Sequence, residues 1–226
     1  MRKPLSIDAR KTSLLCIDLQ EEHRKDQRYL VEGFDAVLGN TRSLQDAARR
    51  AGIAVWHFSY VVDVDAATTR RFHPRMADGS SAFSDKDDPL SATCPEVAPV
   101  AGDRVAIKSE ASAFGTGFGD ELASSGIEWL VVAGVWTEAC VDATVKDALK
   151  RDFRVLLVKD ACGSGSVAMH QTGILNLANR LYGGAVIDTD RAISLFEGQV
   201  VEAWTPNSPV PIQYDAETIA DLYESL

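Results

Sequence analysis

Short, almost uninterrupted apolar runs alternate along the chain with stretches in which apolar residues repeat at helical spacing. The runs predict strands at Ser13–Ile17, Ile53–Ser59, Arg104–Ile107, Trp129–Ala133, Val155–Val158 and Ala185–Ile187. The stretches with helical spacing predict helices near Asp35–Ala51, Phe118–Ser125, Ala139–Arg151, Val167–Tyr182 and Ala216–Ser225. A strand followed by a helix, repeated in this way, predicts a mostly parallel sheet.

The predicted strands are apolar throughout instead of alternating, which is typical of a sheet covered by helices on both faces. The pattern therefore predicts the α/β class, as a three-layer α/β/α sandwich around a six-stranded sheet. The chain has 226 residues and 46% hydrophobic content, so we expect residues 1–226 to form a single domain. Ligands of such folds bind beyond the carboxyl ends of the strands, and residues that follow a strand are therefore the first candidates for function.

One long segment, at about residues 60–102, interrupts the alternation with prolines, mixed charge and a polar stretch at 77–88. Long loops in compact domains are commonly lids, binding segments or mobile surface. A role in covering substrate or contacting a subunit, and a role as plain mobile surface, are equally consistent with the sequence. The segment holds a group of basic residues: Arg70, Arg71, His73 and Arg75.

Charge and composition exclude several classes of partner. The formal net charge is −10 and the pI is near 4.9, so nucleic acid and anionic membrane surfaces would be repelled. No apolar run approaches the roughly 18 residues of a membrane span, and the N-terminal residues lack the apolar core of a secretory signal. These features predict a cytoplasmic protein. The four cysteines show no C-x-x-C spacing, so we expect them to be reduced.

Three polar residues, Asp18, Lys108 and Cys140, each follow a predicted strand. Alone, each has an ordinary explanation: a turn acid, a solvated lysine and a small buried thiol. Together, parallel strands would bring an acid, a cation and a nucleophile to one edge of the sheet. Cys140 is also placed in the first turn of a predicted helix, where free backbone N–H groups and the helix dipole favour a thiolate.

Four ordered blocks of sequence connect these residues to a known family. They are Ile17-Asp18-Leu19-Gln20, Lys108–Thr116, Gly134–Val141 and Val155–Ala161. From about Lys11 to Asp188, the chain resembles the isochorismatase-like cysteine hydrolases, which include nicotinamidases, N-carbamoylsarcosine amidases and ureidoacrylate amidases. The resemblance implies that Asp18, Lys108 and Cys140 form a catalytic triad. It also implies an oxyanion hole made by the backbone amides of Thr137 and Cys140, and a cis peptide bond between Trp136 and Thr137.

The activity that this resemblance implies is hydrolysis of the C–N bond of a small amide, carbamoyl or ureido compound. Cys140 would attack the carbonyl carbon, an amine or ammonia would leave, and water would hydrolyse the thioester. Asp18 would move the proton, while Lys108 would hold the carboxylate and favour the thiolate. Because a lower thiol pKa also lowers nucleophilicity, we expect the oxyanion donors to contribute more than thiol acidity.

No metal and no cofactor are expected. Nicotinamidases carry an Asp-x-His motif after the second strand, whereas this chain has Tyr60-Val-Val-Asp-Val-Asp65 there, which also makes nicotinamide a less favoured substrate. The glycine-containing turns 115–119 and 163–166 lack the spacing of nucleotide-binding motifs.

Candidates for substrate binding are less specific. Phe114 and Trp136 flank the proposed site and are candidates for stacking on a planar substrate, with packing in the core as the alternative. Arg70 and Arg75 are candidates for binding a substrate carboxylate, with a solvated basic cluster as the alternative.

Three other functions fit parts of this pattern. An isochorismate-type vinyl-ether hydrolase would share the fold, but Cys140 argues against it because family members with that activity lack the cysteine. A non-catalytic ligand-binding protein would leave the triad unexplained, and a redox-sensing thiol protein would need Cys162 as a resolving cysteine. The resemblance also implies a homodimer or homotetramer that acts on a small molecule, and the last helix is a candidate for packing on a neighbouring subunit.

Overall fold

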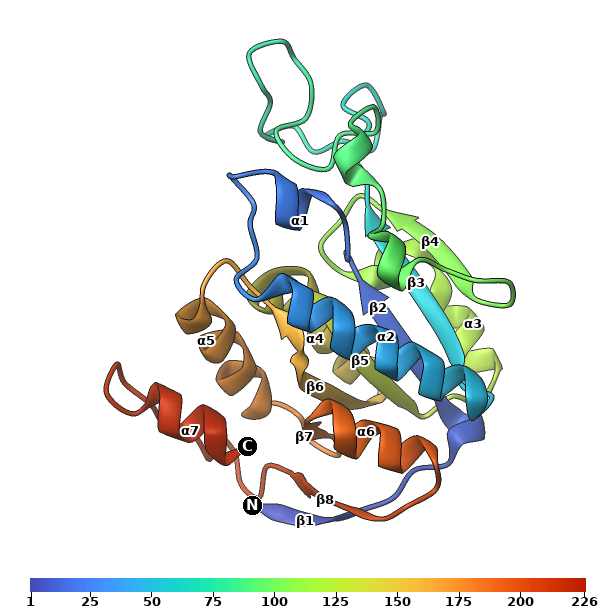
Figure 1. Ribbon diagram of the computed structural model, residues 1–226, viewed down its shortest axis with the longest axis vertical. Helices are drawn as coiled ribbons and strands as arrows, with labels where there is room; N and C mark the ends of the chain where they lie inside the picture. The colour runs from blue at the N-terminus through green and yellow to red at the C-terminus, as the bar shows by residue number, and fades with distance from the viewer.

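The computed structural model describes residues 1–226, which form one eight-stranded sheet with seven α-helices (Figure 1). The strand order is β1-β8-β7-β6-β5-β2-β3-β4. The strands are β1 (Arg2–Leu5), β2 (Thr12–Ile17), β3 (Ala54–Tyr60), β4 (Arg104–Lys108), β5 (Trp129–Val135), β6 (Arg154–Gly163), β7 (Ala185–Ile187) and β8 (Val201–Trp204). The helices are α1 (Glu22–Lys25), α2 (Phe34–Arg50), α3 (Phe118–Ser124), α4 (Asp142–Lys150), α5 (Val167–Ala178), α6 (Thr189–Phe196) and α7 (Ile219–Ser225).

The sheet has eight strands and not the six that the apolar runs predict. The six predicted strands are present and parallel to one another. The additional strand β8 pairs antiparallel with both β1 and β7. The two additional strands have four residues each, and β1 is mostly exposed and contains Pro4. Neither has the continuous apolar run of a strand that is covered on both faces, so the pattern does not reveal them.

Two helices, α1 with four residues and α6 with eight, are also absent from the pattern-based assignment. The last helix, α7, packs on α5 of the same chain, where the Tyr223 hydroxyl lies 3.1 Å from His170 Nε2. Contacts within the chain therefore hold α7 in position without a neighbouring subunit. None of the helices combines the length and apolarity that crossing a bilayer requires.

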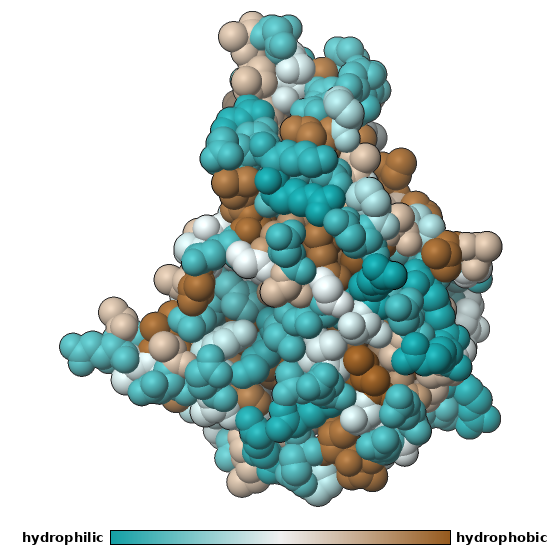
Figure 2. Space-filling view, viewed as in Figure 1, coloured by the Kyte–Doolittle hydropathy of each residue, from teal (hydrophilic) through white to brown (hydrophobic).

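Both faces of the sheet are buried, because successive residues of the central strands enter two different hydrophobic clusters. In β2, Leu14 and Cys16 belong to a cluster that includes residues of α2 and α6. Leu15 and Ile17 belong to a second cluster that includes residues of α4 and α5. Figure 2 shows that the outer surface seen in this view is mostly hydrophilic, with hydrophobic residues in separate patches. Burial of each large apolar side chain contributes about 1.5–3 kcal/mol, so this arrangement holds the strand ends in place.

The chain between β3 and β4 contains only two short 3₁₀ turns, at Pro89–Ser91 and Pro95–Val97, and no strand of the sheet. Figure 1 shows this segment, in teal to green, projecting beyond α1. An isolated bridge joins Thr93 to Gln20, which lies just after β2. The segment is thus attached to the carboxyl end of the sheet.

Gly134 allows β5 to approach β2 at this end of the sheet. Its φ is +128°, and a Cβ atom at this position would lie 2.1 Å from the Ile17 carbonyl oxygen. We expect Gly134→Ala to lower the free energy of unfolding by about 3 kcal/mol or more, because the backbone strain and the clash add together. Urea denaturation measures the loss.

The matched control is Gly126→Ala. Gly126 also has a positive φ, of +71°, but a Cβ atom there would meet nothing within 4 Å. Backbone strain alone should cost about 1–2 kcal/mol. Equal losses in the two variants would show that the close approach to Ile17 does not constrain the strand.

Candidate active site

Asp18, Lys108 and Cys140 come together at the carboxyl ends of neighbouring strands. The strands β5, β2, β3 and β4 lie side by side in this order; Asp18 follows β2, Lys108 ends β4, and Cys140 lies in the turn after β5. The Nζ atom of Lys108 is 2.7 Å from Oδ2 of Asp18. Asp18 and Cys140 line the same cavity. The acid, the cation and the thiol that the sequence singles out therefore meet at one edge of the sheet.

The backbone around Asp18 has a shape that holds its carboxylate in place. Asp18 has a φ of +52°, its N–H donates to the Phe58 carbonyl at 2.9 Å, and its own carbonyl accepts from Gln20 at 2.9 Å. The buried Gln20 amide donates to the carbonyls of Tyr60 and Ser91 and accepts from the Tyr60 N–H at 2.8 Å. Gln20 thus ties β2 to β3 and to the long loop. The sequence pattern assigns Gln20 no role, and its place in the Ile-Asp-Leu-Gln block is the only signal that could have indicated one.

Lys108 reaches Asp18 by crossing the end of β3. Its ammonium group lies 4.4 Å from the centre of the Tyr60 ring and donates to the Glu110 carbonyl at 3.1 Å. The side chains of Lys108 and Asp18 are only 1% and 4% exposed. Burial lowers the pKa of Lys108, but the charges of Asp18 and Cys140 outweigh this effect, so the pKa is raised and the group stays an ammonium ion.

The thiol of Cys140 is not acidified by its surroundings. Burial raises its pKa to about 12 and the charge of Asp18 adds to this rise, while Lys108 only partly opposes it. A raised pKa favours the protonated thiol, whereas the predicted effects of the helix start and of Lys108 favour the thiolate. Cys140 therefore needs a base at the moment of attack.

Asp18 is the base within reach. Its Oδ1 atom is buried and has no hydrogen-bond partner, so this oxygen is free to receive a proton. Burial raises the pKa of Asp18, although Lys108 lowers it, and the net direction is upward. A carboxylate with a raised pKa is a stronger base than an ordinary aspartate.

The turn that carries Cys140 is a short π-helical segment, Thr137–Val141, that leads directly into α4. The Trp136 carbonyl accepts hydrogen bonds from Ala139 at 3.0 Å and from Val141 at 3.2 Å. A cis peptide bond precedes this turn, between Val135 and Trp136. The predicted cis bond, between Trp136 and Thr137, was wrong by one residue, because a resemblance between turns locates the turn but not the bond within it.

Thr137 connects this turn to the C-terminal part of the chain. Its buried hydroxyl donates to the Gly163 carbonyl at 3.0 Å and lies 2.8 Å from His170 Nδ1. Burial lowers the pKa of His170 to about 4, so the ring is neutral, and its Nε2 lies 3.1 Å from the Tyr223 hydroxyl. A continuous set of contacts therefore runs from the turn at Thr137–Val141 to α7.

The cavity beside Cys140 has a volume of about 360 Å³. Its wall is largely aromatic: Tyr29, Tyr60, Phe83 and Trp136 all contribute to it. Phe83 belongs to the long loop, as does Ser84, which also lines the cavity. The loop is thus part of the site.

Of the two aromatic residues that the sequence offers for substrate binding, only Trp136 lines the cavity. Phe114 is buried in the core, with its ring centre 4.6 Å from that of Phe118 and 6.0 Å from that of Phe153. Phe114 therefore has the alternative role, which is packing in the core. The sequence could not separate the two roles, because an aromatic residue next to a site has the same local pattern as one beneath it.

Arg70 and Arg75 are both exposed and do not line the cavity. Arg75 donates to the Val64 carbonyl at 2.8 Å and to the Gly79 carbonyl at 3.3 Å, so it stabilises its own loop. The predicted role of these residues as carboxylate ligands has no support from their positions.

Two residues that the sequence did not mark, Glu22 and His23, line the cavity from α1. His23 Nδ1 lies 3.2 Å from the indole Nε1 of Trp136 and 3.3 Å from the Tyr29 carbonyl oxygen. Its Nε2 lies 3.9 Å from Glu22 Oε1. Burial lowers the pKa of His23, so the ring is neutral. Their position just after β2 was the only signal that could have found them.

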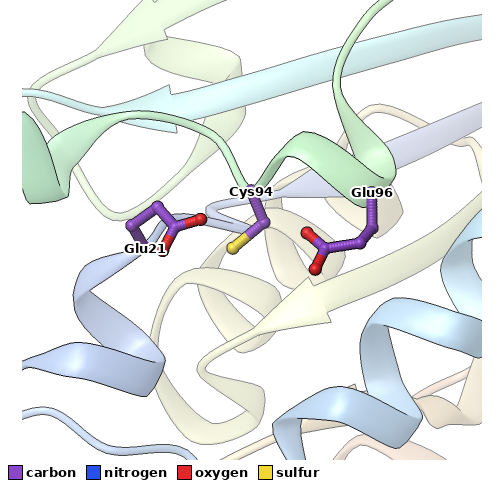
Figure 3. Close-up of side chains that lie close together, drawn as sticks. All are labelled: Glu21, Cys94 and Glu96. Atoms are coloured by element: carbon purple, nitrogen blue, oxygen red, sulfur yellow. The ribbon is translucent and has the colours of Figure 1, made fainter.

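One cluster outside the cavity has ligand atoms close enough to hold a metal ion: Glu21, Cys94 and Glu96, whose atoms lie within 4.8 Å of one another (Figure 3). Both carboxylates are already bound to Arg24. This pairing lowers the pKa of Glu21 to about 2 and also lowers that of Glu96. A metal ion would therefore have to displace Arg24. The three residues come from two distant segments and include no histidine, so the sequence did not indicate them.

Several known proteins resemble this chain in sequence or in fold. The maleamate amidohydrolase of Pseudomonas putida is 31% identical over 80% of this chain and 85% of its own length. The ureidoacrylate amidohydrolase RutB of Variovorax paradoxus is 27% identical over 77% of this chain and 78% of its own. A cysteine hydrolase from Pseudomonas syringae pv. phaseolicola has the same fold, with a TM-score of 0.76, 20% identity, and coverage of 85% of this chain and 95% of the other.

A family model, the isochorismatase domain, matches residues 12–191. This range runs from β2 into α6 and includes the three residues that meet beside the cavity. The chain belongs to the isochorismatase family.

Proposed function

We propose that this protein is a cysteine amidohydrolase that cleaves the C–N bond of a small non-peptide amide, carbamoyl or ureido compound without a metal ion. The observation that carries the proposal is the buried Asp18–Lys108 pair at the cavity that Cys140 lines. The relatives named for amidohydrolase activity support the same reaction class.

In the proposed mechanism, Asp18 accepts the thiol proton as the Cys140 sulfur attacks the carbonyl carbon. The backbone N–H groups of Thr137 and Cys140 stabilise the oxyanion that forms. Asp18 then returns the proton to the leaving nitrogen, the C–N bond breaks, and a thioester remains. Asp18 next takes a proton from a water molecule that attacks the thioester, and the acid is released with the thiol restored. Lys108 keeps the carboxylate in place throughout.

Magnitudes indicate which part of the site matters most. One oxyanion donor is worth about 3 kcal/mol, or more than a hundredfold in rate. Lowering a thiol pKa from about 8.5 to about 6.5 would yield only about threefold at neutral pH, since nucleophilicity falls with the pKa. Acidifying the thiol would therefore contribute less than one oxyanion donor does.

The proposal extends to the organisation of the molecule. We propose a single domain with the three-layer arrangement, a loop at about 60–102 that covers the substrate, and assembly into a homodimer or homotetramer. The contribution of Phe83 and Ser84 to the cavity supports the role of the loop.

The test is a screen of small amides, carbamoyl compounds and ureides for ammonia release. We expect turnover of at least one class, together with selective alkylation of Cys140 by iodoacetamide, since the other three cysteines are fully buried. A binding protein would release no ammonia. Absence of release across the panel would overturn the proposal.

The pH profile of kcat/KM should rise through the pKa of Asp18. A base must be deprotonated to act, and because the pKa of Asp18 is raised, the acid limb should lie above the range of an ordinary aspartate. The pKa values of Lys108 and Cys140 are also raised, so the plateau should extend into alkaline pH. Initial rates from pH 4 to pH 10 measure the profile. A rate that increases only above pH 8 would instead indicate that a thiolate must form first.

A further inference from the structure

We propose that the substrate of this cavity carries no negative charge: it is an amide whose remaining part is uncharged and flat or apolar. The inference deepens the proposed amidohydrolase function and rests on it. It follows from the charges, the hydrogen bonds and the shape of the cavity wall.

The ionisable side chains that line the cavity include no lysine or arginine. The charged groups there are Asp18 and Glu22, both acidic. Lys108, the nearby cation, is 2.7 Å from Asp18 and is already paired with it. A carboxylate in this space would therefore face two acids and no free cation, an arrangement that discriminates against anions.

Glu22 is held in place from the loop side. The N–H of Ser84 donates to Glu22 Oε2 at 2.9 Å, and the Ser84 hydroxyl donates to Oε1. A carboxylate that accepts two such bonds is fixed and cannot turn away from a ligand. In either protonation state, Glu22 provides no positive charge.

The tyrosine hydroxyls and the indole of the wall have already used their donors. The Tyr29 hydroxyl donates to the Ala82 carbonyl at 2.8 Å, and the Tyr60 hydroxyl donates to the Ser109 carbonyl at 3.0 Å. The Trp136 indole donates to His23. An anion that entered would lose its water without gaining these donors, and a buried charge without partners is strongly disfavoured.

The aromatic wall favours a flat or apolar group instead. Tyr29, Tyr60, Phe83 and Trp136 present ring surfaces, which stack on planar ligands and need no charge to do so. Arg70 is a basic side chain near this wall. It is exposed, but it is close enough for its positive charge to act on Tyr60. Movement of Arg70 into the cavity is the specific alternative.

Two pairs of compounds of nearly equal shape test the inference: maleamide against maleamate, and terephthalamide against 4-carbamoylbenzoate. Within each pair, only a carboxamide and a carboxylate are exchanged. Binding is measured by calorimetry on the Cys140→Ser protein, so the result does not depend on turnover, and ammonia release is measured separately on the parent. We expect at least one uncharged compound to bind at least about a hundredfold more tightly than its anion.

Glu22→Gln should strengthen binding of the anions by about tenfold relative to binding of the uncharged compounds. The matched control is Glu128→Gln, at the opposite edge of the sheet, where Glu128 is paired with Lys11; it should change neither.

Anions that bind as tightly as the uncharged compounds, or more tightly, would overturn the inference. Loss of that binding in Arg70→Ala would assign it to Arg70. Failure of all four compounds to bind at 10 mM would also count against the inference. Binding of uncharged compounds without ammonia release from any amide would contradict the amidohydrolase function while leaving the preference for uncharged ligands intact.

Discussion

Replacement of Cys140 by serine is expected to lower kcat/KM by at least about a thousandfold while the protein stays folded. A hydroxyl is far less acidic than a thiol, so Asp18 would have to remove a proton that is held much more tightly. Cys140 is only partly buried and packs against the second core cluster without being one of its buried members, so the change should cost little stability. Steady-state rates together with urea denaturation measure both effects.

The matched control is Cys162→Ser. Cys162 is a buried thiol in β6 that lies 3.8 Å from the Val132 carbonyl and takes no part in the cavity wall. Activity should stay within a few-fold of the parent. This variant also tests the redox-sensor alternative, which needs Cys162 as the resolving thiol. Activity of Cys140→Ser within tenfold of the parent would rule out the proposed mechanism.

Lys108→Met is expected to lower the free energy of unfolding by about 3–5 kcal/mol at neutral pH, because it leaves the buried Asp18 carboxylate without its partner. Activity should fall by at least about a hundredfold as Asp18 becomes protonated. The sign of the pH dependence follows from the raised pKa of Asp18. The folded protein holds this proton more tightly than the unfolded chain does, so the deficit should grow as the pH rises from about 4.

Urea denaturation of Lys108→Met at pH 5 and pH 8 measures this trend, and the loss should be larger at pH 8. The double variant Asp18→Asn/Lys108→Met removes both charges and should recover most of the lost stability, but no activity. Equal stability of Lys108→Met at the two pH values would show that Asp18 is not a buried anion in this protein.

The sequence predicts the central sheet well because the information is local. Each of the six parallel strands is a buried apolar run, and such a run is visible in the chain itself. The strands β1 and β8 lie at one side of the sheet and pair antiparallel, and their stability depends on residues some 200 positions apart that no local pattern reveals. The π-helical turn around Cys140 was likewise read as ordinary helix, because both have similar apolar spacing.

The proximity of Asp18, Lys108 and Cys140 was predictable for a related reason: each follows or ends a strand, and parallel strands end at the same edge. The cavity wall was not. Phe114 and the two arginines had plausible residue types, but their positions depend on how the loop folds. Glu22, His23 and Gln20 lie in the few residues after β2, and their roles depend on contacts with Ser84, Trp136 and Tyr60, which are distant in sequence.

The contacts from Thr137 through His170 to Tyr223 have a practical consequence. Tyr223 lies in the last helix, and the final residue, Leu226, is itself buried at 4% exposure. Displacement of α7 would therefore disturb the segment that supports the turn carrying Cys140. A preparation that is inactive for this reason would say nothing about substrate choice, so the integrity of α7 should be checked before a panel of amides is interpreted.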